Sequence, residues 1–272
     1  MPDRYVVMGN PVGHSRSPSI HARFAQQTGE AVEYGALLVA LGGLPAAVAA
    51  FRAAGGKGAN ITLPFKEDAF ALAGEMTERA RAAGAVNTLV FSKSAIVGDN
   101  TDGCGLTRDL VLNLSFVVEG RRVLLLGAGG GARGVLLPLL EERPALLVVA
   151  NRTIVKAQQM VGRITKGDAR TVTACGYDGL AGQSFDLVVN ATSAGLTDAV
   201  LPLPAHLFAP GSVAYEMMYG RQTGFMQQAR REGAARVSDG LGMLVEQAAE
   251  SFFLWRGVRP LTAPVLAEMR AP

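Results

Sequence analysis

Short runs of apolar residues alternate along the chain with alanine-rich stretches in which apolar positions recur at helical spacing. In the first hundred residues this pattern predicts strands at 5–8, 37–39, 58–62 and 86–91. Helices are predicted at about 44–54 and 76–83, and another is expected to begin at Ser17-Pro18, where a serine cap precedes a proline. Residues 98–105 are turn formers and are expected to form a loop.

A second alternating series starts near residue 123. Its predicted strands cover 123–126, 146–150, 171–174 and 187–190, and its helices cover 132–142, 153–164 and 241–255. Alternation of strands and helices is typical of α/β proteins. We therefore expect one domain at about 1–102 and a second at 103–238, with the C-terminal helices of 239–272 returning to the first domain.

Composition narrows the class of protein. Hydrophobic residues make up 49% of the 272 residues and charged residues 18%, which excludes a disordered or fibrous chain. The two cysteines, Cys104 and Cys175, form no C-x-x-C pair, which excludes a disulfide scaffold and argues against a structural zinc site. The three histidines follow no metal-ligand spacing, so we expect no metal.

Charge and hydropathy exclude further classes. The net charge of +3 is mild and the basic residues are scattered, so a small anionic ligand fits better than nucleic acid. Residues 34–51 carry no charge, but glycines and Pro45 interrupt the run before it reaches the ~20 apolar residues of a membrane span. The N-terminus has no apolar region of the signal-peptide type. We expect a cytoplasmic protein without a membrane or nucleic-acid partner.

A glycine-rich turn follows the predicted strand at 123–126. Gly127, Gly129 and Ala132 form the pattern G-x-G-x-x-A. In dinucleotide-binding folds the first glycine permits the tight turn, the second lets the backbone approach a pyrophosphate, and the small third residue lets helix and strand pack closely. Glycine-rich turns also serve as plain connections, but a strand before and a helix after the turn favour nucleotide binding. We therefore expect a Rossmann-like, doubly wound parallel sheet.

The end of the next strand indicates which dinucleotide binds. An NAD site carries Asp or Glu about 20 residues beyond the glycines, for the ribose hydroxyls. This chain instead has Asn151-Arg152-Thr153, with Lys156 one turn further on. A guanidinium can pair bidentately with a 2′-phosphate that a carboxylate would repel. The alternative is a helix cap with solvated basic residues, but together with the glycine turn the pattern favours NADP.

Four segments of the first domain carry more hydrogen-bonding groups than their structural roles require. They lie at residues 9–18, 60–66, 84–88 and 98–103. Each has a simpler explanation as loop chemistry, and Ser17 taken alone is best explained as a helix cap. Together, at strand ends beside a nucleotide domain, they could line a cleft for a small polyhydroxylated ligand.

These segments resemble those of the shikimate dehydrogenase family, which reduces 3-dehydroshikimate with NADPH. The resemblance runs the length of the chain, through G-N-P-x-x-H-S-x-S-P-x-x-H at 9–21, N-x-T-x-P-F-K at 60–66, A-V-N-T at 85–88, D-N-T-D-G at 99–103, G-A-G-G at 127–130, N-R-T at 151–153, N-A-T-S at 190–193 and D-G-L-G-M-L-V-x-Q-A-A at 239–249. It implies that 1–102 and 239–272 form an α/β substrate-binding and catalytic domain, and that 103–238 bind NADP. It also implies a step of the shikimate pathway to chorismate and aromatic amino acids.

The resemblance implies site residues, position by position. Lys66 and Asp102 match the family's catalytic pair. The implied substrate contacts are Ser15, Ser17, Asn60, Thr62, Lys66, Asn87, Asp102, Tyr215 and Gln247. The implied cofactor contacts are Gly127, Ala128, Gly129, Gly130, Gly131, Ala132, Asn151, Arg152, Thr153, Lys156, Thr192, Ser193, Gly240 and Met243.

Two positions depart from the family's pattern. The family usually has Y-D-x-x-Y, whereas here Glu216 follows Tyr215, so the resemblance does not imply the geometry of this loop. The second basic contact, often arginine, is Lys156, which cannot bind a phosphate bidentately and is expected to discriminate less.

Reduction of a ketone leaves an alkoxide that must gain a proton. A charged lysine at the carbonyl oxygen stabilises the developing charge and supplies the proton, so Lys66 is expected to be the acid, kept charged by Asp102. Ser15 and Ser17 would position the substrate carboxylate. The ring hydroxyls would bind the amides of Asn60, Asn87 and Gln247.

Two alternative functions stay open. One is a relative that acts on quinate or an amino-shikimate and uses NAD. The other is a non-catalytic NADP-sensing regulator, which should have lost part of the Lys66–Asp102 pair. We expect a monomer or homodimer whose partner is shikimate or 3-dehydroshikimate, and closure of a cleft over the ligands is a further hypothesis.

Overall fold

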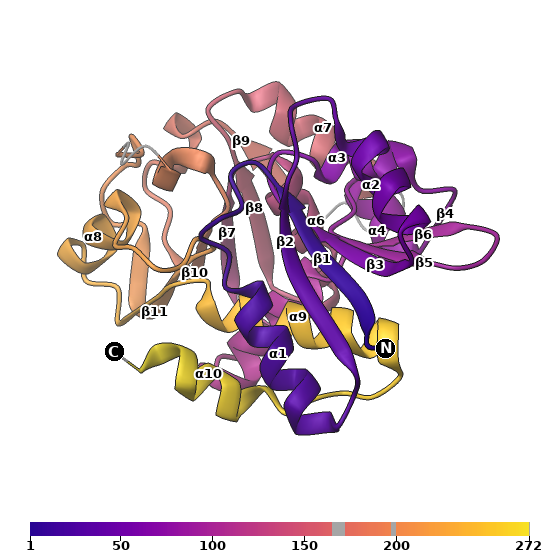
Figure 1. The fold of residues 1–272 in the computed structure, drawn as a ribbon. Coiled ribbons are helices and arrows are strands. Elements are labelled where there is room, and N and C mark those ends of the chain that lie inside the picture. The colour runs from indigo at the N-terminus through magenta and orange to yellow at the C-terminus, as the bar shows by residue number, and fades with distance from the viewer. Residues whose placement is uncertain (165–171, 197–199, 272) are drawn as a thin grey trace. The chain divides into compact units, whose positions relative to one another are not determined.

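The computed structural model describes residues 1–164, 172–196 and 200–271 (Figure 1). The chain divides into two compact units. Unit 1 comprises Met1–Asp109 and Leu244–Pro272, and unit 2 comprises Leu110–Met243. In the described parts of the chain, no helix has the length and apolar character that a membrane span requires.

A six-stranded mixed sheet forms the centre of unit 1. Its strands are β1 (Asp3–Gly9), β2 (Val32–Leu38), β3 (Gly56–Ile61), β4 (Glu75–Met76), β5 (Thr88–Phe91) and β6 (Ile96–Asp99). They lie in the order β2-β1-β3-β5-β6-β4, with β1 parallel to both neighbours and β5 antiparallel to both of its own. The hydrophobic core of the unit packs against this sheet and includes Met8, Ile61 and Leu89.

Helices surround the sheet of unit 1. They are α1 (Ser17–Thr28), α2 (Leu44–Ala53), α3 (Lys66–Leu72), α4 (Glu78–Ala83), α5 (Asp102–Arg108), most of α9 (Leu241–Arg256), and α10 (Thr262–Arg270). Trp255 of α9 stacks on Tyr5 with ring centroids 4.5 Å apart, and its Nε1 donates to the Leu89 carbonyl at 3.1 Å. A Cβ on Gly58 would lie 2.5 Å from Trp255 Nε1, so a glycine there lets α9 approach the sheet. The C-terminal helices thus return to the N-terminal part of the chain, as predicted.

Unit 2 contains a six-stranded sheet in which every strand pair is parallel. The strands are β7 (Arg122–Leu126), β8 (Leu146–Ala150), β9 (Val172–Cys175), β10 (Phe185–Asn190), β11 (Phe208–Glu216) and β12 (Arg236–Ser238). Their order is β12-β11-β10-β7-β8-β9. This is the doubly wound Rossmann order, in which the chain direction across the sheet reverses between β7 and β10. The predicted fold class is confirmed.

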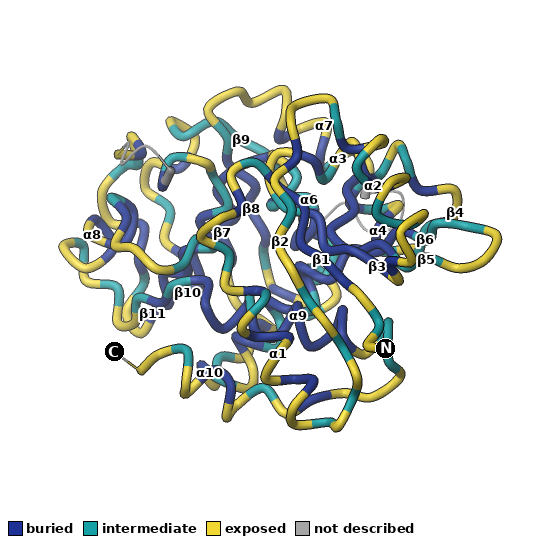
Figure 2. Tube along the Cα trace, viewed as in Figure 1, coloured by how far each residue is buried: buried dark blue, intermediate teal, exposed yellow. Residues whose placement is uncertain are grey.

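The helices of unit 2 are α6 (Gly130–Glu141), α7 (Ile154–Ile164) and α8 (Gly224–Arg231). Strands β7, β8 and β10 are buried almost throughout, which Figure 2 shows in dark blue. Parallel strands covered on both faces need continuous apolar runs rather than alternation, and Leu124 and Val188 are examples at the centre of the core. This explains why the sequence pattern located these strands well.

The predicted bounds or types of several elements in unit 1 were wrong. Residues 98–105 are not a loop, because β6 covers Ile96–Asp99 and α5 begins at Asp102. Gly98 lies within β6, and a Cβ there would be 2.8 Å from both Ala73 and Val86, so close packing accounts for the glycine. The strand predicted at 37–39 is only the end of β2, and the helix predicted from residue 76 begins two residues later. Ser17 is the first helical residue and not the cap.

Other differences are smaller. The contacts divide the chain after Asp109 and Met243, whereas the predicted division falls after residues 102 and 238. In unit 2 the strand predicted at 171–174 is observed as Val172–Cys175, and Thr171 lies outside the described residues. The short helices α3 and α5 and the strands β11 and β12 were not predicted.

Candidate active site

Lys66 and Asp102 meet at the starts of two short helices of unit 1. Lys66 is the first residue of α3, shortly after β3, and Asp102 is the first residue of α5, shortly after β6. Lys66 Nζ lies 2.5 Å from Asp102 Oδ2. The side chain of Lys66 is 16% exposed and that of Asp102 is 6% exposed, so the pair is shielded from bulk water while the amine can still meet a ligand. The structure therefore joins the two residues expected to be an acid and its partner.

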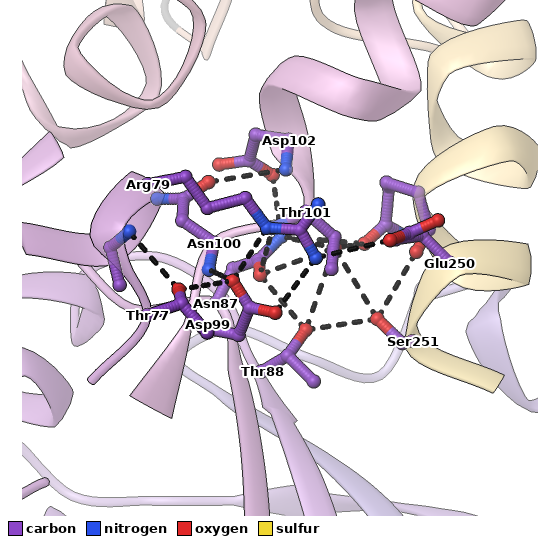
Figure 3. A network of polar contacts seen from close by, with 12 residues as sticks. Thr77, Arg79, Asn87, Thr88, Asp99, Asn100, Thr101, Asp102, Glu250 and Ser251 are labelled. Atoms are coloured by element: carbon purple, nitrogen blue, oxygen red, sulfur yellow. Dashed lines mark hydrogen bonds and ion pairs between the residues drawn. The ribbon is translucent and has the colours of Figure 1, made fainter. Parts of the chain in front are cut away.

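Asn87 holds the Asp102 carboxylate from its other side. Asn87 Nδ2 donates to Asp102 Oδ1 at 2.8 Å, and Asn87 Oδ1 accepts from the backbone amide of Thr101 at 2.9 Å. The backbone amide of Asp102 donates to Asn100 Oδ1 at 3.1 Å. Both carboxylate oxygens of Asp102 thus have defined partners, Lys66 and Asn87. The side chains of Asn87 and Asn100 also fix the turn that leads into α5 (Figure 3).

Buried hydroxyl groups connect Asn87 to helix α9. Ser251 Oγ lies 2.9 Å from Thr88 Oγ1 and 3.3 Å from Thr101 Oγ1 (Figure 3). Gln247, one turn earlier on α9, accepts through Oε1 from Thr101 Oγ1 at 3.3 Å and from Asn87 Nδ2 at 3.5 Å. A buried polar group is costly unless it is paired, so each of these side chains restricts the orientation of the others.

A second layer of charged residues supports the same turn. Arg79 Nε and Nη2 donate to the two carboxylate oxygens of Asp99 at 2.6 and 2.7 Å, and Nη2 also donates to Glu250 at 3.1 Å (Figure 3). Asp99 Oδ1 accepts from the backbone amide of Asn100 at 2.7 Å. Burial acts to raise the pKa of Glu250, but Arg259 and Arg79 bring it below its usual value. These ion pairs anchor the segment immediately before Asp102.

Tyr34, which the sequence did not single out, orients Asn60. The Tyr34 hydroxyl donates to Asn60 Oδ1 at 2.7 Å, and Asn60 Nδ2 donates to Thr88 Oγ1 and Ser251 Oγ, both at 3.0 Å. Burial raises the pKa of Tyr34 well above its usual value, and a hydrogen bond with Ser17 opposes the shift. Tyr34 therefore links Ser17 and Asn60, two residues predicted to bind substrate.

His21 packs under Tyr34 as a neutral ring. The two rings are stacked, with centroids 4.1 Å apart and planes 5° from parallel, and Phe24 and Phe252 lie at the other edges of His21. Burial lowers the pKa of His21 to about 3. A histidine in this state carries no charge at neutral pH, and His21 serves as a packing residue between these rings.

Ser15 and Thr62 lie in unit 1, as do all the predicted substrate residues except Tyr215. Ser15 Oγ accepts from the backbone amide of Ser17 at 3.3 Å, at the entrance to α1. The backbone amide of Thr62 donates to the Met8 carbonyl at 2.9 Å. A Cβ on Gly9 would lie 2.4 Å from Thr62 Cγ2, which explains the glycine at the start of the first motif.

In unit 2 the glycine-rich turn has the shape of a backbone cradle. Gly127 has φ +107°, and a Cβ on it would lie 3.1 Å from the backbone of Ala191, so the turn requires glycine. A Cβ on Gly129 would meet nothing within 4 Å, and no side chain caps the N-terminus of α6. Ala132 is fully buried. Open space beside uncapped helix amides fits a pyrophosphate, so Gly127 to Ala132 could hold a dinucleotide.

The predicted phosphate-binding segment follows β8. Asn151 Nδ2 donates to the Thr153 carbonyl at 2.9 Å, and its backbone amide donates to the Cys175 carbonyl at 3.2 Å. These bonds hold the turn between β8 and α7, but Asn151 donates to a carbonyl and so does not cap the helix as the alternative supposed. Arg152, Thr153 and Lys156 are exposed at the start of α7, where their polar groups could meet a 2′-phosphate.

Three further predicted cofactor residues lie at strand ends of unit 2. Asn190 Oδ1, at the end of β10, accepts from the backbone amide of Thr192 at 3.1 Å and from its hydroxyl at 2.8 Å. Ser193 follows and is exposed. A Cβ on Gly240 would lie 2.1 Å from the Met217 carbonyl oxygen, so the turn before α9 packs closely on the loop after β11.

Tyr215 belongs to unit 2, near the end of β11. Its side chain is fully buried, and its hydroxyl accepts from the backbone amide of Met243 at 3.3 Å. Met243 is itself 6% exposed. The predicted contact of Tyr215 with substrate stays a prediction.

Several side chains that organise the site were not predicted from the sequence. Thr88 and Thr101 lie inside quoted motifs, and Ser251 lies four residues after Gln247, hence on the same helix face, so a signal existed for all three. Arg79 and Tyr34 had no such signal. Their roles depend on strands and helices that meet only in the folded unit.

Metal and thiol chemistry find no support in the described residues. No group of three or more His, Cys, Asp or Glu side chains in those parts of the chain could hold a metal ion. Cys104 and Cys175 are free thiols. Burial raises the pKa of Cys104 to about 11 and that of Cys175 above its usual value, so both are protonated at neutral pH.

Models of known protein families match most of the chain. Residues 7–89 match the shikimate dehydrogenase substrate binding domain, 111–197 match shikimate / quinate 5-dehydrogenase, and 240–270 match the shikimate 5′-dehydrogenase C-terminal domain. A curated relative from Methylobacillus flagellatus, named shikimate dehydrogenase (NADP(+)), is 58% identical over 99% of both chains.

Solved structures give the same result. An Ael1 enzyme from Pseudomonas putida is 49% identical with a TM-score of 0.93, covering 99% of both chains. Shikimate 5-dehydrogenase from Thermus thermophilus, solved in complex with NADP(H) and shikimate, is 32% identical with a TM-score of 0.86, covering 98% of both chains.

Proposed function

The chain belongs to the shikimate dehydrogenase family, and on that premise we propose that it catalyses the reversible NADP-dependent reduction of 3-dehydroshikimate to shikimate. The observation that carries the proposal is the contact of Lys66 Nζ with Asp102 Oδ2 at 2.5 Å, inside a buried polar network. The reaction belongs to the shikimate pathway, which leads to chorismate and the aromatic amino acids.

Unit 1 would bind the substrate. Ser15 and Ser17 at the entrance to α1 would position its carboxylate. The ring hydroxyls would meet Asn60, Thr62, Asn87 and Gln247. Their amides are already oriented by buried partners, and such a site rejects analogues that lack a hydroxyl, because the absent group leaves a buried partner unpaired. Tyr215 of unit 2 would complete the set.

Lys66 would act as the acid in the reductive direction. Its ammonium group stabilises negative charge on the substrate oxygen and donates a proton to it. Asp102 holds the amine by the ion pair, and Asn87 keeps the carboxylate in place. In the oxidative direction the neutral amine would take the proton back. Bound NADPH would supply the hydride.

Unit 2 would bind the cofactor. The turn from Gly127 to Ala132 and the first amides of α6 would bind the pyrophosphate. Asn151, Arg152, Thr153 and Lys156 would bind the adenosine 2′-phosphate, with Arg152 as the main charge. Thr192, Ser193, Gly240 and Met243 would lie along the nicotinamide half. The corresponding domains would be residues 103–238 for NADP and the remainder for substrate.

Two alternatives are less well supported. A quinate or amino-shikimate dehydrogenase using NAD would not need the paired serines or the Arg152 position. A non-catalytic NADP sensor would not need Lys66 and Asp102 in contact. We further propose a cytoplasmic location, supported by the two free thiols, and a monomer or homodimer.

A matrix of initial rates tests the proposal. Shikimate and quinate are each combined with NADP+ and NAD+, and formation of reduced cofactor is followed by its absorbance. The fastest rate is expected for shikimate with NADP+. A faster rate with quinate or NAD+ would favour the first alternative. Binding of NADPH without any turnover of shikimate would favour the sensor.

A further inference from the structure

We propose that Glu216 is a positioning residue for NADP, whose carboxyl group holds the loops after β10 and β11 in the conformation that binds the cofactor. The inference rests on the proposed function, because it concerns the cofactor site of unit 2. Glu216 is the last residue of β11 and its side chain is fully buried. It is also one of the two positions at which the chain departs from the family's usual sequence.

Three hydrogen-bond donors converge on this carboxylate. Oε2 accepts from Asn190 Nδ2 at 2.7 Å and from Thr223 Oγ1 at 2.8 Å, and Oε1 accepts from the backbone amide of Met218 at 3.1 Å. The donors are a side-chain amide, a hydroxyl and a backbone amide, not a lysine or arginine. Glu216 therefore acts as an acceptor for neutral groups from three segments of the chain.

Each donor residue forms a further hydrogen bond that holds a neighbouring segment of the chain. Asn190 Oδ1 accepts from the backbone amide and the hydroxyl of Thr192, which fixes the loop after β10. Thr223 Oγ1 accepts from the backbone amide of Met226 and so caps α8. The Met218 carbonyl accepts from the backbone amide of Gly240 at 2.9 Å, which fixes the turn before α9.

The loops that Glu216 holds also touch the glycine-rich turn. A Cβ on Gly127 would lie 3.1 Å from the backbone of Ala191, and a Cβ on Gly131 would lie 3.6 Å from Met217 Cε. A shift of either loop would therefore change the wall of the pyrophosphate cradle. Because these loops contact the glycine-rich turn, Glu216 positions the cofactor site in addition to stabilising its own surroundings.

The hydrogen-bond pattern requires a carboxylate and not a carboxamide. A glutamine at position 216 would present one NH2 group to a set of donors. With that group toward Asn190, two NH2 groups face each other unless the Asn190 amide turns over, and then the Thr192 amide loses its acceptor. With that group toward Met218, the Met218 backbone amide loses its acceptor instead. Every orientation leaves a buried or partly buried donor unpaired.

The test compares Glu216→Gln with Glu216→Asp, which keeps the charge on a shorter side chain. Glu232→Gln is a matched control, because Glu232 accepts from Gln228 Nε2 at 2.8 Å in the same unit. The direct readout is the Kd of NADPH, measured by cofactor fluorescence without substrate. KM values for NADP+ and shikimate and the thermal melting of each variant complete the set.

We expect Glu216→Gln to weaken NADPH binding about tenfold and to raise the KM for NADP+ in parallel, with the KM for shikimate within about twofold of wild type. Glu216→Asp should stay within about threefold of wild type in NADPH binding, and Glu232→Gln should match wild type.

Three results would overturn the proposal. One is NADPH binding by Glu216→Gln that equals wild type. The second is an equal loss in the KM for shikimate and for NADP+. The third is a glutamine variant that fails to fold beside a fully normal aspartate variant, which would assign Glu216 to folding. If the wild-type protein binds NADPH but does not oxidise shikimate, the proposed function fails while the binding comparison still decides the role of Glu216.

Discussion

The two units place polar groups at the ends of strands by different means. In unit 1 the groups are side chains, and Lys66, Asp102 and Asn87 are held by a buried network of amides, hydroxyls and ion pairs. In unit 2 the cradle is backbone, shaped by the absence of side chains at Gly127 and Gly129. We therefore expect substitutions that remove side-chain atoms to impair the site in unit 1, and substitutions that add side-chain atoms to impair the cradle in unit 2.

This difference follows from what each unit would bind. A small ring with several hydroxyls needs donors and acceptors at defined positions, which only side chains from several elements supply. A pyrophosphate needs several parallel N–H groups and a favourable dipole, which the start of one helix already provides. Variants of the two units should consequently separate effects on turnover and substrate from effects on the cofactor.

The largest effect is expected at Lys66. Lys66→Ala removes the proposed proton donor and the cation beside Asp102, so kcat should fall by about 10²- to 10⁴-fold, with a smaller change in the KM for shikimate. Steady-state kinetics in the direction of shikimate oxidation measure both parameters. Lys57→Ala, at an exposed position of β3, is the control. A variant that keeps most of its turnover would remove Lys66 from the mechanism.

A smaller but more selective effect is expected at Gly129. Its φ of −87° suits any residue and the surrounding space is open, so Gly129→Val should fold normally while filling the cradle. The KM for NADP+ should rise about tenfold or more, and the KM for shikimate should stay near wild type. Gly162→Val, also at an open position of unit 2, is the control. An unchanged KM for NADP+ would place the cofactor elsewhere.

Tyr34→Phe tests whether side chains outside the predicted set organise unit 1. The change leaves Asn60 Oδ1 without the 2.7 Å hydrogen bond, at a cost of about 1 kcal/mol, so the KM for shikimate should rise about fivefold. The KM for NADP+ should not change. Tyr5→Phe removes a hydroxyl that lies 3.5 Å from Arg256 in the same unit and serves as the control. Equal effects of the two variants would contradict a specific role for Tyr34.

The smallest effect at neutral pH concerns His21. The folded protein keeps this ring neutral down to a pKa of about 3, whereas the unfolded chain binds a proton below about pH 6.5, so acid favours unfolding. Between pH 6.5 and pH 5, His21 should reduce the free energy of unfolding by up to about 1.4 kcal/mol per pH unit. Urea unfolding at several pH values measures the slope, which His21→Phe should remove and His14→Gln should not. A slope unchanged by His21→Phe would show that other groups cause it.

The same contrast explains how well each unit was predicted. In unit 2, buried parallel strands such as β7 and β8 are continuous apolar runs, and the glycine turn is local in sequence. Both features are therefore visible without knowledge of the fold. In unit 1 the edge strand β2 alternates only weakly and β6 contains glycine, so their pattern resembles that of loops.

The candidate site divides along similar lines. Lys66, Asp102 and Asn87 lie in motifs that could be read directly, and the resemblance assigned their roles. The sequence could not predict that Asn87 forms hydrogen bonds with Thr101 and Asp102, or that Arg79 forms an ion pair with Asp99. Each bond joins strands or helices that are separated along the chain. The sequence could not predict the hydrogen bonds of Glu216 either, since its three donors come from positions 190, 218 and 223.

The sequence by itself determined the parallel sheet, the glycine cradle, and the presence of a lysine and an aspartate in polar motifs, because these depend on residues that are neighbours along the chain. The resemblance implied that the lysine and the aspartate act as a pair, but tertiary structure alone decided the geometry of their contact, which buried partners orient them, and which glycines are required by close packing. Those features depend on strand order and on the approach of helices to sheets, and hydrophobic periodicity specifies neither.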